Sequence, residues 1–330
     1  MNGQKGMMIH LDNVSKIFAG TPRPAVDRVT LSVKNGDICV FVGPSGCGKT
    51  TILRMINRLE EPDSGTISIN GRNTLEMDPA ALRRTIGYVI QQVGLLPHRT
   101  IARNIAIVPD LLKWPREKTE KRVKDLLDMM GLDPEEVAGK YPYQLSGGQA
   151  QRVGVARALA ADPPIMLMDE PFAAVDPIVR LRLQEEFLRL QQSFKKTICF
   201  VTHDINEAIK LGDFVVILNQ GRIVQTGTPV EVLTAPADRF VANLLGDDRG
   251  IKLLDLTRSE VLMEPVESLP AAMSENGNSV QAIAPVKAAL EMMMTKNTDE
   301  IGVYRELKPV GILRWNDIKS HVNRVSGRES

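Results

Sequence analysis

The stretch Gly43-Pro-Ser-Gly-Cys-Gly-Lys-Thr50 decides the fold of this 330-residue chain. It fits the pattern G-x-x-x-x-G-K-[ST], and it lies between an apolar strand that ends at Val42 and a helix predicted from about Gly48 to Leu59. Glycines let such a backbone wrap around phosphates with its N–H groups pointing inward. This setting favours a phosphate-binding loop over a glycine-rich structural turn. The predicted contacts are Gly43, Pro44, Ser45, Gly46, Cys47, Gly48, Lys49, Thr50 and Thr51.

Three side chains of this loop have distinct expected roles. Lys49 is expected to reach the β- and γ-phosphates of a nucleotide, and the hydroxyl of Thr50 is expected to bind Mg²⁺. Cys47 is expected to fill the loop as a small residue rather than to act as a redox switch. The loop therefore predicts a nucleotide site that includes a metal ion.

The run Ile165-Met-Leu-Met-Asp169-Glu170 is an apolar strand that ends in two acids. Phosphoryl transfer needs a carboxylate that holds Mg²⁺ and a group that orients or deprotonates water. Asp169 is expected to support the metal, and Glu170 is expected to polarise the attacking water. Acids at the end of a strand are often only solvated caps, but the preceding phosphate loop favours the catalytic interpretation.

Residues up to about 245 alternate short apolar runs with helix patterns, which predicts an α/β fold with a largely parallel sheet. Runs without polar alternation indicate strands that are covered on both faces. These runs are Ile38–Val42, Ile165–Met168, Ile198–Val201 and Phe214–Leu218. Residues from about 95 to 157 are expected to form a helical insertion. The predicted domains are 1–245 and 246–330.

Composition narrows the class of protein. Apolar residues make up 43% of the chain and charged residues 25%, which is typical of a soluble globular protein. Basic residues number 41 and acidic residues 40, and this balance argues against a general attraction to nucleic acid or anionic lipid. Three cysteines without C-x-x-C spacing favour the reducing cytosol over a disulfide framework or a zinc site. Without a signal peptide or a run of ~18–20 apolar residues, any membrane part is expected on another chain.

Leu145-Ser-Gly-Gly-Gln149 resembles the signature motif of ATP-binding-cassette (ABC) proteins. A serine and two glycines before a helix form a second anion cradle, and because the chain already has one phosphate loop, this cradle is expected to serve a nucleotide held by a partner copy. The resemblance covers residues 8 to about 245. It implies a P-loop NTPase core of ABC type with an antiparallel β subdomain and a helical subdomain, ATP and Mg²⁺ as ligands, and a homodimer. The residues expected to act in trans are Ser146, Gly147, Gly148, Gln149 and Asp176.

Other positions match the family one by one. Phe18 occupies the place of the aromatic residue that stacks on adenine. His203, in Val201-Thr-His-Asp204, matches the histidine that contacts the γ-phosphate. Gln91 matches the glutamine that contacts Mg²⁺ and water, with Gln92 as the rival position. The resemblance thus implies catalytic roles for Glu170, His203, Gln91 and Lys49, and metal binding by Thr50, Gln91 and Asp169.

The chain also departs from the family pattern at three places. Ala-Ala-Val at 173–175 replaces the usual Ser- or Gly-Ala-Leu, Ala150 stands where Gln is common, and Phe18 replaces the commoner Tyr. None of these changes removes a catalytic group, so hydrolysis is still expected. Ala173 removes a possible hydroxyl contact across the dimer, and that contact is not expected here.

Four stretches are similar to the ATPase subunits of osmoprotectant importers, which move glycine betaine, choline, carnitine or proline-type solutes. They are Ile86–Gln92, Ile107–Trp114, Gly154–Pro164 and Leu183–Leu190. The implied partners are integral membrane permease subunits and an extracytoplasmic solute-binding protein, and the implied location is peripheral, on the cytoplasmic face of the cell membrane. The alternatives are an importer of another polar solute, an exporter, and a non-transport ATPase acting on nucleic acid or ribosomes. A single cassette without heptads disfavours the last of these.

The tail resembles one cystathionine-β-synthase-type (CBS) repeat over Val280–Met294, Asp299–Val303 and Lys308–Ile318. Its expected order is helix, strand, strand, helix. Such repeats usually pair face to face, and only one copy is recognisable. We therefore expect a small α/β regulatory unit that packs against its counterpart in the second subunit. The alternative is a degenerate tail with only a stabilising role.

Overall fold

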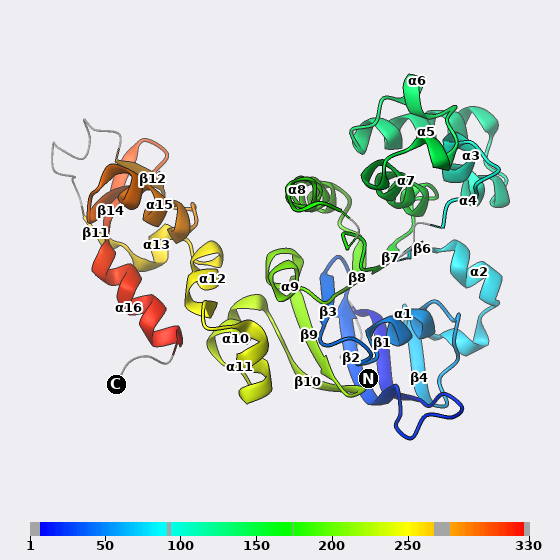
Figure 1. The fold of residues 1–330 in the computed structure, drawn as a ribbon, viewed down its shortest axis with the longest axis horizontal. Coiled ribbons are helices and arrows are strands. Elements are labelled where there is room, and N and C mark those ends of the chain that lie inside the picture. Colours follow the sequence, from blue (N-terminus) through cyan, green and yellow to red (C-terminus); the bar gives the residue numbers. More distant parts are fainter. Residues whose placement is uncertain (1–6, 91–93, 174, 267–277, 327–330) are drawn as a thin grey trace. The chain divides into compact units, whose positions relative to one another are not determined.

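The computed structural model describes residues 7–90, 94–173, 175–266 and 278–326. The chain divides into two compact units, Met1–Thr226 and Gly227–Ser330. Each unit has its own apolar core. Figure 1 shows the elements of both units, coloured along the sequence.

A six-stranded sheet of order β10-β9-β3-β8-β7-β6 forms the centre of the first unit. The pairs β9–β3, β3–β8, β8–β7 and β7–β6 are all parallel. Every residue of β3, β7 and β8 is buried, which explains why these runs lack polar alternation and confirms the predicted core strands. The strands are β3 (Ile38–Val42), β6 (Ile86–Val89), β7 (Ile165–Asp169), β8 (Thr197–Thr202), β9 (Phe214–Asn219) and β10 (Arg222–Gly227).

A second, antiparallel sheet of order β2-β1-β4-β5 belongs to the same unit. One face of β1 is buried through Ile9 and Leu11, which share a core with Phe41 of the central sheet. Burying a side chain of this size contributes about 1.5–3 kcal/mol. The antiparallel subdomain is thereby confirmed. Its strands are β1 (Met7–Lys16), β2 (Val26–Lys34), β4 (Ser64–Ile69) and β5 (Arg72–Asn73).

Four further helices of the first unit lie along the chain between these strands. They are α1 (Lys49–Ile56), α2 (Pro79–Arg84), α8 (Pro177–Phe194) and α9 (Ile205–Leu211). Asp78 and Asp176 cap α2 and α8, each accepting a hydrogen bond from the first turn and each followed by a proline that suits the first helical position. Helix α1 ends before the predicted Leu59, because Arg58 adopts a φ of +50° that leaves the helical region.

Five helices lie between Ile101 and Leu159, where the sequence predicts a helical insertion at residues 95 to 157, and the bounds of that insertion stay a prediction. Buried apolar side chains on α3, α5 and α7, such as Ile105, Leu126 and Val153, hold these helices together. A 3₁₀ turn at Pro142–Gln144 precedes α7, and another occupies Thr74–Glu76 in the first part of the chain. The helices of the insertion are α3 (Ile101–Ile105), α4 (Ile107–Leu111), α5 (Arg116–Met129), α6 (Pro134–Val137) and α7 (Gly147–Leu159).

The second unit contains a four-stranded sheet of order β11-β14-β13-β12. Its core includes Val286, Met293, Ile301 and Leu313. The strands are β11 (Glu264–Pro265), β12 (Ser279–Gln281), β13 (Glu300–Arg305) and β14 (Lys308–Arg314). The helices are α10 (Pro229–Thr234), α11 (Arg239–Leu245), α12 (Arg249–Leu256), α13 (Ser259–Leu262), α15 (Val286–Lys296) and α16 (Trp315–Ser326).

The order α15-β13-β14-α16 is the order expected of the tail, although the resemblance to a CBS repeat stays a prediction. Helix α12 contacts α10 as well as α15 and α16, so α10 lies with the second unit. The predicted domain boundary near residue 245 likewise stays a prediction. In the part of the chain that the structure describes, no helix combines the length and the apolar composition that crossing a membrane requires.

Candidate functional site

The predicted phosphate-binding loop connects β3 to α1 at the carboxyl end of the central sheet (Figure 1). Gly43 has a φ of +152° and Gly48 a φ of +104°, conformations that favour glycine. A Cβ atom added at Gly43 would lie 2.1 Å from the carbonyl oxygen of Leu218, and one at Gly48 would lie 2.3 Å from that of Ala25. Neighbouring backbone therefore leaves no room for a side chain at these two positions of the loop.

Lys49 lies across the loop. Its Nζ atom donates hydrogen bonds to the carbonyl oxygens of Gly43, at 2.7 Å, and Pro44, at 2.9 Å, and the side chain is buried. The Sγ atom of Cys47 is 3.7 Å from the same Nζ atom. Burial raises the pKa of the Cys47 thiol, so the thiol remains protonated at neutral pH and packs within the loop.

Thr50 and Asp169 form an oxygen pair beside the loop. The Oγ1 atom of Thr50 donates a hydrogen bond of 2.9 Å to Oδ1 of Asp169, which ends β7 and is buried. Burial raises the pKa of the Asp169 carboxyl, and the hydrogen bond from Thr50 partly offsets this effect. A hydroxyl and a carboxylate fit Mg²⁺, which takes few protein ligands and completes its shell with water and substrate phosphates. Gln91, the third predicted metal ligand, lies outside the described residues.

Glu170 and His203 lie next to each other after strands β7 and β8. The Oε2 atom of Glu170 is 3.2 Å from Nδ1 of His203. Glu170 has a φ of +46°, a conformation that costs a residue other than glycine about 1–3 kcal/mol. A hydrogen bond of 3.0 Å from its N–H to the carbonyl oxygen of Val201 holds this conformation. Such strain is concentrated at functional sites, where the surrounding structure maintains it.

The strand order explains why these residues meet. Strands β3, β8 and β7 are consecutive in the sheet and parallel, so their carboxyl ends lie along one edge. The phosphate loop follows β3, His203 follows β8, Asp169 ends β7 and Glu170 comes directly after it. Ligands of open α/β sheets bind at this edge. The structure therefore brings together the phosphate loop, the carboxylate pair and the histidine that were predicted from distant parts of the sequence.

Phe18 lies in the turn between β1 and β2 and is half-buried, with the Lys16 ammonium 5.7 Å from the centre of its ring. The turn ends at Ala25, whose N–H donates a hydrogen bond of 2.8 Å to the carbonyl oxygen of Lys16. The carbonyl oxygen of Ala25 is also the atom that leaves no room for a Cβ atom at Gly48. Phe18 thus belongs to a turn that borders the phosphate loop, as a residue stacking on the base of a nucleotide requires.

The segment Ser146–Gln149 forms the capped start of α7. Gln149 N–H donates to Oγ of Ser146 at 3.3 Å, and Ser146 N–H donates to Oε1 of Gln149 at 3.0 Å. A Cβ atom added at Gly147 would meet no heavy atom within 4 Å, and one at Gly148 would meet only Val179, at 4.0 Å. No hydrogen bond or ion pair among the described residues joins this segment to the phosphate loop. The segment is an open helix start on the surface of the chain.

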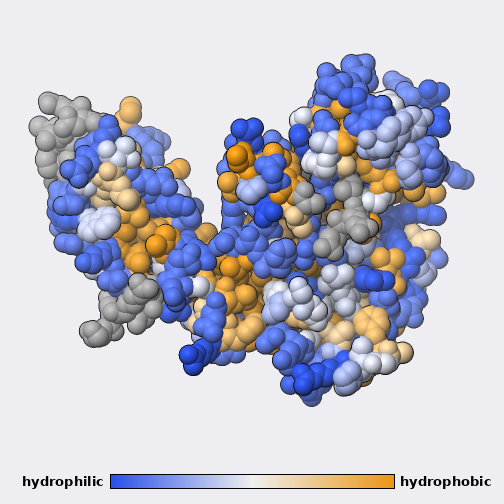
Figure 2. All heavy atoms as spheres, in the orientation of Figure 1, coloured by the Kyte–Doolittle hydropathy of each residue, from blue (hydrophilic) through white to orange (hydrophobic). Residues whose placement is uncertain are grey.

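Asp176 is exposed and caps α8, accepting hydrogen bonds of 3.1 Å from the N–H groups of Ile178 and Val179. The first turns of α8 expose apolar side chains, with Ile178 70% exposed and Leu181 54% exposed. Figure 2 shows apolar surface over this helix. Exposed apolar surface of this kind is typical of a surface that contacts another molecule.

A buried polar cluster beneath His203 was not predicted from the sequence. It consists of Thr202 at the end of β8, Glu207 on α9 and Gln184 on α8. Glu207 occupies the first turn of its helix, where an acid is ordinarily a solvated charge that complements the helix dipole. The only sequence signal is its position four residues after His203.

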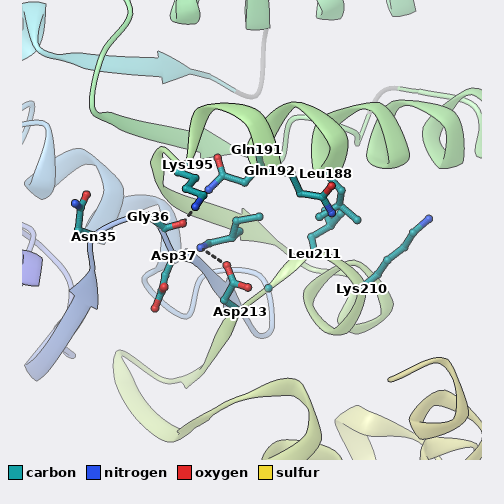
Figure 3. A pocket seen from close by; sticks show the side chains of 12 residues that line it. Asn35, Gly36, Asp37, Leu188, Gln191, Gln192, Lys195, Lys210, Leu211 and Asp213 are labelled. Atoms are coloured by element: carbon teal, nitrogen blue, oxygen red, sulfur yellow. Dashed lines mark hydrogen bonds between the residues drawn. The ribbon is translucent and has the colours of Figure 1, made fainter. Parts of the chain in front are cut away.

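A cavity of about 510 Å³ opens at the opposite edge of the central sheet (Figure 3). Its walls include the turn before β3 and the carboxyl-terminal ends of α8 and α9. The N–H of Ile38 donates to Oδ2 of Asp213 at 2.9 Å, and the amide of Gln191 donates to the carbonyl oxygen of Gly36 at 3.0 Å. This cavity lies at the amino end of β3, whereas the predicted nucleotide site lies at its carboxyl end.

Comparisons with known proteins identify the family of this chain. The ABC transporter family model matches residues 26–173. The glycine betaine/carnitine/choline transport ATP-binding protein OpuCA of Bacillus subtilis is 50% identical over 316 residues, which cover 96% of this chain and 78% of that protein. The osmoprotectant import ATP-binding protein OsmV of Salmonella typhimurium is 46% identical over an alignment of 334 positions, gaps included, which covers 97% of this chain and 85% of that protein.

A solved structure gives the same fold. The dimeric ATP-binding cassette MJ0796 bound to ADP and Pi matches with a TM-score of 0.62 and 36% identity, covering 67% of this chain and 99% of that chain. The predicted ABC-type nucleotide-binding fold is therefore confirmed. With half of its residues shared with such proteins over nearly its whole length, this chain belongs to the ABC transporter family, as an ATP-binding subunit that hydrolyses ATP to power transport.

Proposed function

We propose that this chain energises the import of a small osmoprotectant of the quaternary ammonium or betaine type. The observation that carries the proposal is the extent of the similarity. Relatives named for glycine betaine, carnitine and choline transport match 91% to 96% of the chain, including most of the tail. A sulfate/thiosulfate import ATP-binding protein of Chromobacterium violaceum is 48% identical but matches only 68% of the chain. A second sulfate/thiosulfate import ATP-binding protein, of Pectobacterium atrosepticum, matches 85% of the chain at only 38% identity. The cassette is thus common to several importers, and the similarity to the osmoprotectant group extends over more of the chain at comparable or higher identity.

In the proposed site, the loop Gly43–Thr51 binds the phosphates through the Lys49 ammonium and through its backbone N–H groups, which every residue of the loop except Pro44 has, and Phe18 stacks on adenine. Thr50, Asp169 and Gln91 would hold Mg²⁺, which when bound neutralises charge on the phosphate oxygens. The hydrogen bond between Thr50 and Asp169 supports this assignment, since it brings two potential ligand oxygens within 2.9 Å of each other.

Glu170 is proposed to polarise the water that attacks the γ-phosphorus, and His203 to contact the γ-phosphate. The 3.2 Å approach of Glu170 to Nδ1 of His203 supports both roles, because it orients the ring and leaves Nε2 available to a phosphate oxygen. The strained backbone of Glu170 supports its role further. A fixed carboxylate and a fixed imidazole need no reorganisation when the water attacks.

The second half of each site is proposed to come from a partner copy. Ser146, Gly147, Gly148 and Gln149 would contact the γ-phosphate held by the other chain, and Asp176 would cross the interface. Room around the two glycines and exposed apolar residues at the start of α8 support this arrangement. The solved cassette with ADP and Pi is itself dimeric.

The proposed partners beyond the dimer are permease subunits in the cell membrane and an extracytoplasmic solute-binding protein, with this chain at the cytoplasmic face. The helical subdomain offers a rigid surface for the permease. Buried Asn104 holds the loop before α3, accepting from Leu96 N–H at 2.7 Å and donating to the carbonyl oxygens of Leu96, Arg99 and Thr100. A loop that is fixed by four hydrogen bonds to three of its residues can transmit a rotation of the subdomain to a permease helix docked on it.

Uptake measured in cells tests the proposal. The chain is expressed with its permease and binding protein in cells that lack their own osmoprotectant uptake, and entry of labelled glycine betaine, choline and sulfate is followed. Uptake of the quaternary ammonium solutes is expected, and it should disappear with Glu170→Gln. Sulfate uptake without glycine betaine or choline uptake would contradict the assigned solute class while leaving the ATPase assignment intact.

A further inference from the structure

A buried carboxylate lies beneath the loop that carries His203, outside the residues assigned so far. Glu207 is only 7% exposed, although it is in the first turn of α9. Its Oε2 atom accepts a hydrogen bond of 2.6 Å from the Thr202 hydroxyl, and its Oε1 atom accepts one of 3.1 Å from the Gln184 amide. Both oxygens are therefore bound by side chains from two other elements, β8 and α8.

Glu207 does not serve its own helix. A glutamate at this position often accepts the N–H of the capping residue, which here is Asp204. In this chain the Asp204 N–H instead donates to Oγ1 of Thr202 at 3.0 Å, and the Asp204 carboxylate caps the N–H of Asn206 at 2.8 Å. Asp204 thus caps the helix without help from Glu207, whose carboxylate points into the protein.

Burying the Glu207 side chain lowers the stability of the fold, so we expect it to serve a function. Burial raises the pKa of the Glu207 carboxyl, and hydrogen bonds from Thr202 and Gln184, together with the nearby charge of Arg180, only partly offset the effect. Well-packed apolar residues would avoid the cost of desolvating a carboxylate. The carboxyl group lies at a point where its hydrogen bonds restrain two loops of the nucleotide site.

The first restrained loop contains His203. The Thr202 hydroxyl donates a hydrogen bond to Glu207, and the oxygen of the same hydroxyl accepts one from the N–H of Asp204. Thr202 and Asp204 flank His203, so these two hydrogen bonds fix the backbone on both sides of the imidazole. The ring itself is more than half exposed, and its Nδ1 atom faces Glu170 at 3.2 Å.

The second restrained loop is the one that contains Asp176. Gln184 and Arg180 belong to α8, the helix that Asp176 caps. The Nη2 atom of Arg180 donates a hydrogen bond of 3.1 Å to the carbonyl oxygen of Val175, the residue before Asp176. Glu207 therefore ties the end of β8 to the helix that begins at the proposed dimer-crossing loop.

We propose that Glu207 is a positioning residue for ATP hydrolysis. Through Thr202 it holds the His203 ring beside Glu170, and through Gln184 it ties the loop that carries His203 to α8. The inference rests on the role proposed above for His203. It requires that loss of the Glu207 carboxylate misplace the imidazole without disturbing the phosphate loop. Misplacing a catalytic group by about 1 Å costs up to ~10²-fold in rate.

Two substitutions in the full-length protein separate positioning from mere stability. Glu207→Ala should lower kcat by about tenfold or more, while the Kd for ATP changes by less than about twofold. Glu207→Gln should recover most of the kcat, because its amide oxygen still accepts from Thr202 and the Gln184 amide can reverse to accept from it. His203→Ala serves as the reference for complete loss of the histidine.

A second pair keeps the test decisive if Glu207→Ala does not fold. Thr202→Val removes the hydroxyl with little change of shape, whereas Thr202→Ser keeps it. The chain has four histidines, so His203→Ala identifies the His203 signal in a ring-nitrogen NMR spectrum. We expect Thr202→Val to shift this signal and to lower kcat, and Thr202→Ser to do neither to a comparable extent.

The outcomes distinguish this inference from the proposal on which it rests. An inactive His203→Ala protein together with parental kcat in Glu207→Ala or Thr202→Val would overturn the positioning role alone. Equal losses of kcat and ATP binding in Glu207→Ala and Glu207→Gln would also overturn it, because they indicate a general disturbance of the fold. Parental turnover in His203→Ala would instead overturn the proposed role of His203. Loss of kcat at constant ATP affinity, recovered by Glu207→Gln, is the result that we expect.

Discussion

The phosphate loop and the signature segment Ser146–Gln149 are both rich in glycine and both precede a helix, but their surroundings differ. A Cβ atom at Gly43 would lie 2.1 Å from a carbonyl oxygen of β9, whereas one at Gly147 would meet nothing within 4 Å. The fold of the chain requires the first glycine and has no need of the second. In the proposed dimer, the room left at this glycine would let the nucleotide of a second copy approach the backbone closely.

The largest expected effect concerns the chemistry on the phosphate-loop side. Glu170→Gln should lower kcat by about 10²–10³, because the water is no longer polarised, while ATP still binds through the intact loop. Lys49→Ala should instead weaken ATP binding itself. Steady-state ATPase rates and ATP titrations of both proteins check this contrast. Near-parental turnover in Glu170→Gln would remove the role assigned to that carboxylate.

The comparison of the two glycine-rich segments is sharpened by a matched pair of alanine substitutions. Gly43→Ala should lower the free energy of unfolding by about 2–4 kcal/mol, since its Cβ cannot avoid the backbone of Leu218. Gly147→Ala should change the free energy of unfolding by less than about 0.5 kcal/mol and still lower ATPase activity. Thermal unfolding and ATPase assays measure the two effects. Equal destabilisation by both substitutions would show that the segments do not differ in this way.

The sequence predicts the phosphate-loop side of the site well, for a local reason. The loop from Gly43 to Thr50 and the acids Asp169 and Glu170 are each contained in a short segment beside a fully buried strand. Parallel strands place such strand ends at one edge, so local patterns suffice to predict the cluster. The signature segment is recognised only by its resemblance to a family, because the nucleotide that it is proposed to contact is held by a second copy and not by its own chain.

Glu207 shows what sequence patterns leave out. An acid in the first turn of a helix is ordinarily solvated, and its inward orientation here depends on Thr202 and on Gln184, which precedes Glu207 by 23 residues. The domain boundary presents a similar difficulty. The helix pattern of Pro229–Thr234 does not reveal that this helix packs on Arg249–Leu256 of the tail. Contacts between distant segments decide both cases.

The smallest expected effect on ATPase activity comes from removing the tail. Truncation after Leu245 should leave ATP hydrolysis within about twofold of the parent, because the nucleotide residues all lie in the first unit. A second truncation after Thr226, which also removes α10 and α11, serves as the matched variant. Loss of ATP binding in the longer protein would show that the tail belongs to the cassette.

The central claim is that one nucleotide site needs two chains, and mixing two inactive proteins tests it most directly. Ser146→Arg blocks the signature segment, and Lys49→Ala disables the phosphate loop. In a mixed dimer, the intact loop of the first protein meets the intact signature segment of the second. Mixing Lys49→Ala with Glu170→Gln is the control, because both changes lie on the phosphate-loop side and no intact site can form.

ATPase activity of the equimolar mixtures is the measurement. Random pairing makes about half of the dimers mixed, each with one intact site of two, so the Ser146→Arg and Lys49→Ala mixture should regain about a quarter of the parental activity. The control mixture should remain inactive. No recovery in the first mixture, with both proteins folded and able to dimerise, or parental turnover per chain under strictly monomeric conditions, would contradict the two-chain site.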